Sequence, residues 1–187
     1  MTEAPQAARG APDDASHGPR AESSSRLPWW ALAGVALAGV GVDQACKQIA
    51  LARLDPARPV SLLGGLVRLE LTRNPGAAFS MGEGVTVVFA VAAILALAAV
   101  VVFVVPRLTS RLQGVVVAVL MAGIAGNLVD RLVRPPRPFH GYVVDFIGLP
   151  HFAIVNVADI FITCAAVLIG VHLVFFAPPR RAEETPS

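Results

Sequence analysis

Charged side chains are scarce in this sequence. Only 15% of its 187 residues are Asp, Glu, Lys or Arg, against about 25% in a typical soluble domain. The net charge of +2 is small and no basic patch is interleaved with aromatic residues, so a nucleic-acid partner is excluded. Cysteine is nearly absent as well. Cys46 and Cys164 each lie in an apolar run, which indicates neither a disulfide framework nor a CxxC metal site.

Apolar residues are correspondingly abundant. They make up 55% of the chain, and the mean hydropathy is +0.66. Four apolar segments are long enough to cross a bilayer at about 1.5 Å rise per residue. These segments are residues 27–51, 85–105, 112–129 and 152–177. The sequence therefore predicts an all-α membrane protein, in which a four-transmembrane-helix bundle forms a single membrane domain over residues 27–177.

The segment between the first two spans, residues 52–84, has a different pattern. Its side chains alternate in polarity over residues 66–71, and an NPG turn signal follows at 74–76. We expect a small extramembrane β element here, followed by a loop or short helix at 77–81. Such a platform beside a membrane site can bind an extended peptide by adding a strand.

The two ends of the chain are polar. Residues 1–26 are rich in Ala, Pro, Ser, Gly and charge, so we expect a disordered tail, and residues 178–187 form a short polar C-terminal tail. No small-residue cleavage pattern closes the first apolar run, which we interpret as an uncleaved span. With both termini inside, seven Lys or Arg lie inside and eight outside, so these counts do not determine the orientation.

Carboxylates stand between or inside these apolar runs, where each costs at least a few kcal/mol and marks a functional site by default. Asn127 precedes Asp130 by three residues, and Asn156 precedes Asp159 by three, so each pair shares a helix face. Four antiparallel spans place a larger polar set at one end of the bundle. This set is Asp43, Asn74, Asn127, Asp130, Arg131, Asp145, Asn156 and Asp159.

Such carboxylates can hydrolyse an amide without a covalent intermediate. Two that approach each other in a low-dielectric site share a proton, so one activates water while its protonated partner polarises a carbonyl. The sequence holds no Ser/His/Asp arrangement and no HExxH pair. We therefore expect neither a metal nor a cofactor.

Each of these residues also has a structural interpretation. Asp43 and Lys47, four apart, can form an ion pair, and Asp130 with Arg131 can hold the third span to a neighbour, the role we favour for both. Asn74 can simply form the turn, while Asn127 and Asn156 can be interhelical hydrogen-bond partners. Alternative functions are a proton-conducting transporter, a membrane scaffold and a GxGD-type peptidase. A transporter predicts midplane carboxylates and an internal repeat, and no GxGD occurs here.

Five sequence blocks resemble those of the lipoprotein signal peptidases, the bacterial signal peptidase II family. They are DQACK at 43–47, RNPGAAFS at 73–80, AGIAGNLVDRL at 122–132, VVDFI at 143–147 and VNVAD at 155–159. The departures are Cys46, Ala122 and Val155, together with a loop lengthened by RPPRPF. We interpret them as variations of packing and of the loop.

The resemblance implies an aspartic endopeptidase of the bacterial inner membrane, with both termini cytoplasmic and its active site near the extracytoplasmic face. Its substrates would be diacylglyceryl-modified prolipoproteins, cut on the N-terminal side of the lipidated cysteine. The catalytic pair would be Asp145 and Asp159. Supporting or substrate-positioning roles would fall to Asp43, Asn74, Asn127, Asp130, Arg131 and Asn156. The expected partners are these substrates and membrane lipids, and we expect a monomer.

Overall fold

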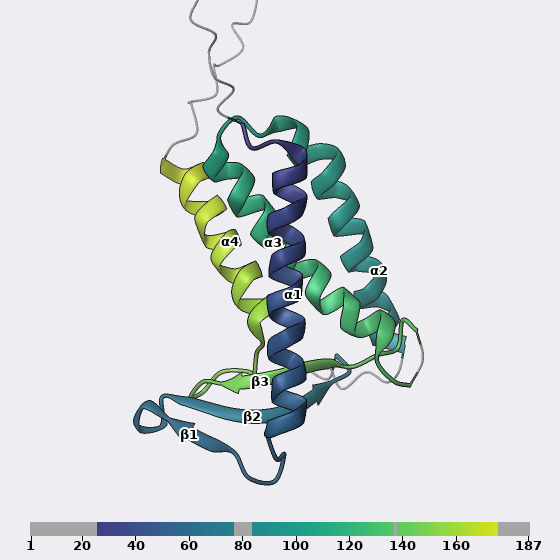
Figure 1. Cartoon of the computed structure of the whole chain (residues 1–187), viewed down its shortest axis with the longest axis vertical. Coiled ribbons are helices and arrows are strands. Elements are labelled where there is room, and N and C mark those ends of the chain that lie inside the picture. Colours follow the sequence, from purple (N-terminus) through teal and green to yellow (C-terminus); the bar gives the residue numbers. More distant parts are fainter. Residues whose placement is uncertain (1–25, 77–83, 137, 176–187) are drawn as a thin grey trace, which may run out of the picture.

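Four long helices dominate the computed structural model, which describes residues 26–76, 84–136 and 138–175. Figure 1 shows α1 (Trp29–Arg53), α2 (Gly84–Ala99), α3 (Arg111–Val133) and α4 (Val157–Phe175). Helix α2 continues through η3 (Val100–Val104) and η4 (Val105–Arg107). All four helical segments are long and apolar enough to cross a membrane, which confirms the predicted bundle. The expected loop or short helix at 77–81, residues 1–25 and the C-terminal tail lie outside the described residues.

Helix α3 is the centre of the bundle, because it contacts each of the other three spans. Its small residues allow close approach. A Cβ atom at Gly123 would lie 2.5 Å from the carbonyl oxygen of Ala158 on α4, so only glycine fits there. Small residues on α3 therefore set how closely α4 can pack against it. Large apolar side chains on the outside of the bundle, such as Leu95 and Val174, are exposed, as lipid contact requires.

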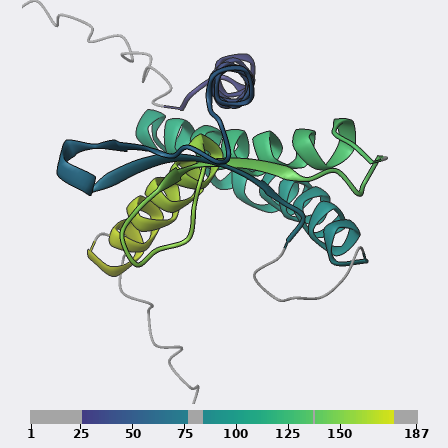
Figure 2. The same ribbon diagram turned by 90° about the horizontal axis from the view of Figure 1, so that it is seen from below.

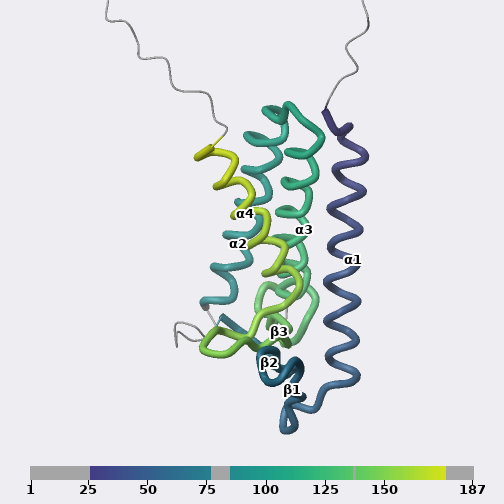
Figure 3. Tube along the Cα trace, turned by 90° about the vertical axis from the view of Figure 1, so that its left-hand side faces the viewer, coloured from purple at the N-terminus to yellow at the C-terminus, as the bar shows by residue number. Residues whose placement is uncertain are grey.

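A three-stranded antiparallel sheet lies at one end of the bundle, while the start of α1 and the end of α4 lie at the other (Figures 1 and 3). Its strands, in spatial order, are β1 (Val60–Leu62), β2 (Val67–Asn74) and β3 (Val143–Gly148), and η1 (Leu63–Gly65) joins the first two. Figure 2 looks at the bundle from the sheet side. The strands β2 and β3 cross in front of the other helices, and α1 stands to one side.

The predicted β element between the first two spans is confirmed, but the sequence analysis missed β3. This strand comes from the connection between α3 and α4 and pairs with β2, with Asp145 opposite Thr72. A short apolar run such as VVDFI does not by periodicity alone distinguish a strand from a helix segment. Val144 and Phe146 pack with Ala50 of α1 and Leu71 of β2 in a buried cluster, which fixes the sheet to the bundle.

Two helix boundaries differ from the prediction. Helix α3 continues to Val133, so Asp130 is helical rather than beyond the span. Helix α4 begins at Val157 rather than near Phe152, because Asn156 caps it: the Asn156 Oδ1 accepts the backbone N–H of Asp159 at 3.1 Å, and the Asp159 carboxylate accepts that of Asn156 at 3.1 Å. This reciprocal pair is a capping box. Asp159 therefore lies in the first turn, and Asn156 precedes the helix.

Candidate active site

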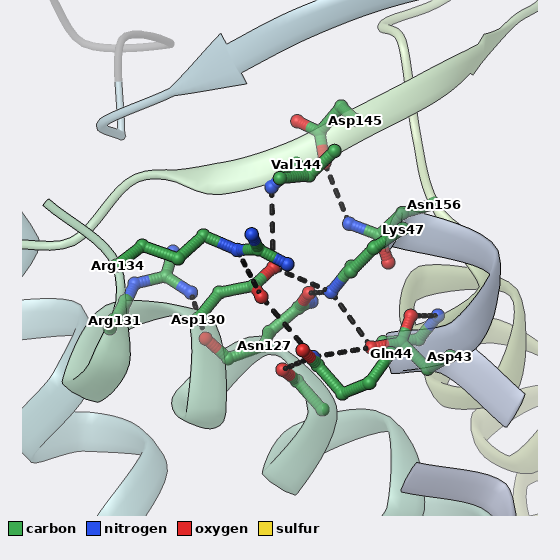
Figure 4. Close-up of polar contacts among 12 residues, drawn as sticks. Asp43, Gln44, Lys47, Asn127, Asp130, Arg131, Arg134, Val144, Asp145 and Asn156 are labelled. Carbon is green, nitrogen blue, oxygen red and sulfur yellow. Dashed lines mark hydrogen bonds and ion pairs between the residues drawn. The ribbon is translucent and has the colours of Figure 1, made fainter. Parts of the chain in front are cut away.

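A buried lysine organises the polar residues at the sheet end of the bundle. The Lys47 Nζ lies 2.8 Å from Asp43 Oδ2, 2.8 Å from Asp130 Oδ2 and 2.9 Å from Asn127 Oδ1 (Figure 4). An ammonium group has three protons, and each of these acceptors can take one. Lys47, Asp43 and Asp130 are completely buried, so their charges are compensated within the protein rather than by water.

Asp130 joins three elements. Besides Lys47 on α1, its carboxylate accepts the Arg134 Nε at 2.6 Å, one turn along α3, and the backbone N–H of Val144 on β3 at 3.2 Å. The Gln44 Nε2 donates to the Asp130 Oδ1 at 3.2 Å and to the Gly126 carbonyl at 3.0 Å. Through these contacts Asp130 links α3 to α1 and β3. We call Asp43, Gln44, Lys47, Asp130 and Arg134 the ion-paired cluster.

Asp145 projects from β3 and contacts two asparagines. The Asn74 Nδ2 donates to its Oδ2 at 2.9 Å, and the Asn156 Nδ2 donates to its Oδ1 at 2.6 Å. Only 3% of Asp145 is exposed. Burial raises the pKa of Asp145 to about 6, with a smaller contribution from the Asp159 charge, while the two asparagine hydrogen bonds and the Lys47 charge oppose the shift. Near neutral pH this carboxyl is therefore able to gain or lose a proton.

Asn74 forms the turn that its NPG sequence indicates and also contacts Asp145. Its Oδ1 accepts the backbone N–H of Gly76 at 2.8 Å, which forms the turn after β2. The same side chain donates to Asp145 through its other polar atom. The turn therefore also orients a carboxylate.

Asp159 is held in the same way, by amide groups. The Asn127 Nδ2 donates to its Oδ1 at 2.8 Å, and the Asn156 backbone N–H donates to its Oδ2 at 3.1 Å. Asn156 thus contacts both Asp145 and Asp159, while Asn127 contacts both Lys47 and Asp159. We call Asp145 and Asp159, with the amides of Asn74, Asn127 and Asn156, the amide-held pair.

Arg131 lies at the edge of this region. Its Nη1 donates to the Asn127 carbonyl at 3.1 Å, and its guanidinium carbon lies 5.4 Å from the centre of the Phe89 ring on α2, within the range of a cation–π contact. Its Nε is buried without a hydrogen-bond partner among the described residues. Arg131 thus contacts α2 through the Phe89 ring.

The structure brings all eight sequence-predicted residues to the sheet end, seven of them joined by the hydrogen bonds and ion pairs above and Arg131 attached through Asn127. Sequence reasoning missed Gln44, Arg134 and the contact between Lys47 and Asp130. The four-residue spacing of Asp130 and Arg134 is a signal that identifies one of these pairs. Among the described residues, no group of three His, Cys, Asp or Glu is arranged to hold a metal ion.

Fold and site together define a multi-pass membrane protein with a carboxylate-rich centre at one end of its bundle. The sequence model of the family described as signal peptidase (SPase) II matches residues 35–175. The chain therefore belongs to the signal peptidase II family.

Similar proteins support this assignment. The lipoprotein signal peptidase of Streptomyces coelicolor is 39% identical over 142 residues, which cover 74% of this chain and 67% of that protein. That of Rhodococcus jostii is 40% identical over 146 residues, covering 78% and 72%. A bacterial membrane enzyme solved by the in meso method at 1.9 Å has a TM-score of 0.72 and 26% identity, covering 82% of this chain and 99% of its own.

Proposed function

We propose that Asp145 and Asp159 are the catalytic pair with which this chain, a peptidase of the signal peptidase II family, removes signal peptides from prolipoproteins. One observation carries the proposal. Asn156 donates its side-chain N–H to Asp145 at 2.6 Å and its backbone N–H to Asp159 at 3.1 Å. A single residue therefore holds two carboxylates from different elements beside each other.

The chemistry follows from this juxtaposition. With one proton between them, the ionised carboxylate takes a proton from water, and the water oxygen attacks the scissile carbonyl carbon. The protonated carboxyl donates a hydrogen bond to the carbonyl oxygen as it becomes an oxyanion. Collapse of the tetrahedral intermediate then breaks the C–N bond, and the leaving amine takes up the proton that the first carboxylate removed from water. The pKa of about 6 for Asp145 keeps such a proton within reach near neutral pH.

The supporting residues hold this pair rather than react. Asn127 and Asn156 orient the carboxylates, and Asn74 holds Asp145 from β2. Asp43 and Asp130 support the pair indirectly. They hold Lys47, and Lys47 in turn contacts Asn127. Arg131 and the sheet help to position the substrate backbone, since Asp145 itself lies on β3 of this sheet.

The substrate and orientation are part of the same proposal. The chain works in the bacterial cytoplasmic membrane, cuts on the N-terminal side of a diacylglyceryl-modified cysteine, and acts as a monomer. The sheet end faces the extracytoplasmic side and both termini face the cytoplasm. The start of α1 and the end of α4 lie at the same end of the bundle (Figure 3), which supports placing both on one side of the membrane. Arg107 and Arg111 flank the short connection at that end, which favours the cytoplasmic side for it. The lipid chains of the substrate lie against the apolar outer surface.

Cleavage of a diacylglyceryl-modified prolipoprotein by the purified protein tests the proposal. We expect Asp145→Asn and Asp159→Asn each to reduce the rate by about 10³-fold or more, because each removes an acid–base group. Asp55→Asn is the matched control, since Asp55 lies exposed in the turn after α1, and it should cut like the wild type. If both dyad variants retain normal cleavage, the assignment fails and Asp130 becomes the next candidate.

A further inference from the structure

A groove opens at the end of the bundle opposite the sheet, between the end of α2 with η4, the start of α3 and the end of α4. Its volume is about 400 Å³, within the usual range of ligand sites. Apolar side chains such as Val104, Val116 and Leu168 form its walls. The corresponding ends of α2, α3 and α4 lie together, away from the strands, in Figure 3.

Polar side chains gather among the lining residues of the groove. Ser110 and Gln113 form a capping box at the start of α3, and the Gln113 Nε2 lies 3.2 Å from the His172 Nε2 on α4. The Gln113 Oε1 already accepts backbone N–H groups from Thr109 and Ser110, so its amide nitrogen faces His172 as the donor. This bond joins α3 to α4 beside the groove and holds its shape.

Arg107 gives the groove its charge. It is exposed and donates one N–H to the carbonyl of Phe103, and a guanidinium has five N–H donors. The sequence contains no Asp or Glu between Val85 and Val129, nor any between Ile160 and Phe175. No acidic side chain of these spans therefore competes for Arg107.

We propose that this groove binds one anionic membrane phospholipid, with an acyl chain along the apolar walls and the phosphate at Arg107. Guanidinium groups bind phosphate with two parallel hydrogen bonds. Basic pockets between membrane helices are suited to anionic lipid headgroups. The groove supplies both parts of such a site, an apolar channel at membrane depth and a cation at its mouth.

Charge and distance argue against two other occupants. The N-terminal region of a signal peptide is positively charged, and the described residues at this end of a second copy include Arg26, Arg107 and Arg111, so both would be repelled by Arg107. Along α3, Gln113 and Asn127 are separated by about 21 Å at about 1.5 Å per residue. The groove is therefore distinct from the carboxylate centre, and the proposal does not depend on the peptidase activity.

Native mass spectrometry of the full chain, released from detergent micelles after titration with phosphatidylglycerol, tests the proposal. We expect one retained phosphatidylglycerol per chain and much weaker retention of phosphatidylcholine. Arg107→Gln should weaken retention on the order of tenfold. Arg111→Gln is the matched control, because Arg111 is equally exposed and nearby but does not line the groove, and it should retain lipid like the wild type.

A groove-filling variant, Val116→Trp, should also abolish retention while thermal unfolding in detergent stays cooperative. Equal losses from Arg107→Gln and Arg111→Gln would overturn the proposal, because retention would then report the positive charge of the whole surface. Equal retention of phosphatidylglycerol and phosphatidylcholine would also overturn it and indicate an occupant bound through its apolar part alone.

Discussion

Asp130 and Asp145 are both buried at the sheet end of the bundle, yet their surroundings differ in kind. Asp130 lies 2.8 Å from the Lys47 ammonium and 2.6 Å from the Arg134 guanidinium. Asp145 accepts hydrogen bonds from the neutral side-chain amides of Asn74 and Asn156, and within the described part of the chain no Lys or Arg forms an ion pair with it. Lys47 affects Asp145 only from a greater distance.

The comparison shows how one residue type serves two purposes a few ångströms apart. A carboxylate in direct contact with cations from other parts of the chain acts as a fixed link between helices. A carboxylate held by amides keeps its orientation, but burial without a cation in ion-pair contact raises its pKa, as at Asp145. The ion-paired cluster therefore builds the framework, whereas Asp145 of the amide-held pair, with its raised pKa, can gain or lose a proton near neutral pH. Four substitutions and conditions test this division.

The largest effect on stability is expected at Lys47. Lys47→Met should lower the free energy of unfolding by about 3–5 kcal/mol, because it leaves the buried Asp43 and Asp130 carboxylates without their shared cation. Asp145→Asn should cost about 1 kcal/mol or less. Unfolding in detergent, followed by tryptophan fluorescence, measures both. Equal losses in the two variants would remove the distinction between cluster and pair.

Asn156 separates catalysis from helix capping. Asn156→Ser should retain most of the stability, because serine also caps helices, but it should lower kcat by about 100-fold, since its hydroxyl cannot replace the amide that holds Asp145. Asn156→Ala should lose the same activity and also about 1 kcal/mol of stability. Steady-state cleavage and thermal unfolding of both variants provide the test. A fully active serine variant would refute the bridging role.

Gly126 tests the packing of the ion-paired cluster. A Cβ atom there would lie 2.6 Å from the Asp43 Oδ2 and 3.2 Å from the Ala158 Cβ. Gly126→Ala should therefore cost about 1–3 kcal/mol. Gly34→Ala is the control on α1, where a Cβ would meet nothing within 4 Å, and it should be neutral or slightly stabilising. Thermal unfolding of the two variants measures the difference, and a neutral Gly126→Ala would show that α1 can shift freely.

The last test concerns pH, where the effect is spread over about two pH units. Burial raises the pKa of Asp145 from 3.8 to about 6 in the folded chain, so between these values the folded state binds more protons than the unfolded state. Stability contributed by this group is therefore greatest at low pH and is lost as the pH rises through 6, by at most about 1.4 kcal/mol per pH unit. The difference in unfolding free energy between wild type and Asp145→Asn, measured from pH 4 to 7, should show this slope. A flat difference would contradict the amide-held description.

The four spans and the β1–β2 pair were predictable because each leaves a local pattern in the sequence. The spans are long apolar segments, and the strands alternate in polarity. The position of Asn156 before α4 was not predictable, although an Asn with Asp three residues later is a capping signal. The apolar residues before it, 152–155, read as helix, whereas Val155 instead bridges Ile147 beside β3. Tertiary pairing overrode hydropathy at this point.

The sequence predicted which residues form the site but not which of them contact each other. Spacing placed polar residues at one end of the bundle, yet it could not show that Lys47 joins Asp43 to Asp130, because that contact spans residues far apart in the chain. Nor did it show that β3 places Asp145 beside Asn74, since strand pairing between distant segments leaves no local pattern. The roles of these residues in catalysis stay predictions.

One backbone N–H in the first turn of α4 has its hydrogen-bond acceptor on α1, the first span of the chain. The backbone N–H of Ala158 donates to the Asp43 Oδ1 on α1 at 2.9 Å. Both residues are completely buried, so the loss of this acceptor would leave the N–H without a partner. During biosynthesis the earliest span must therefore already be in place when the last one docks. Asp159, one residue further on, reaches its position only in that final step, so no shorter, half-synthesised form of the protein has both aspartates assembled.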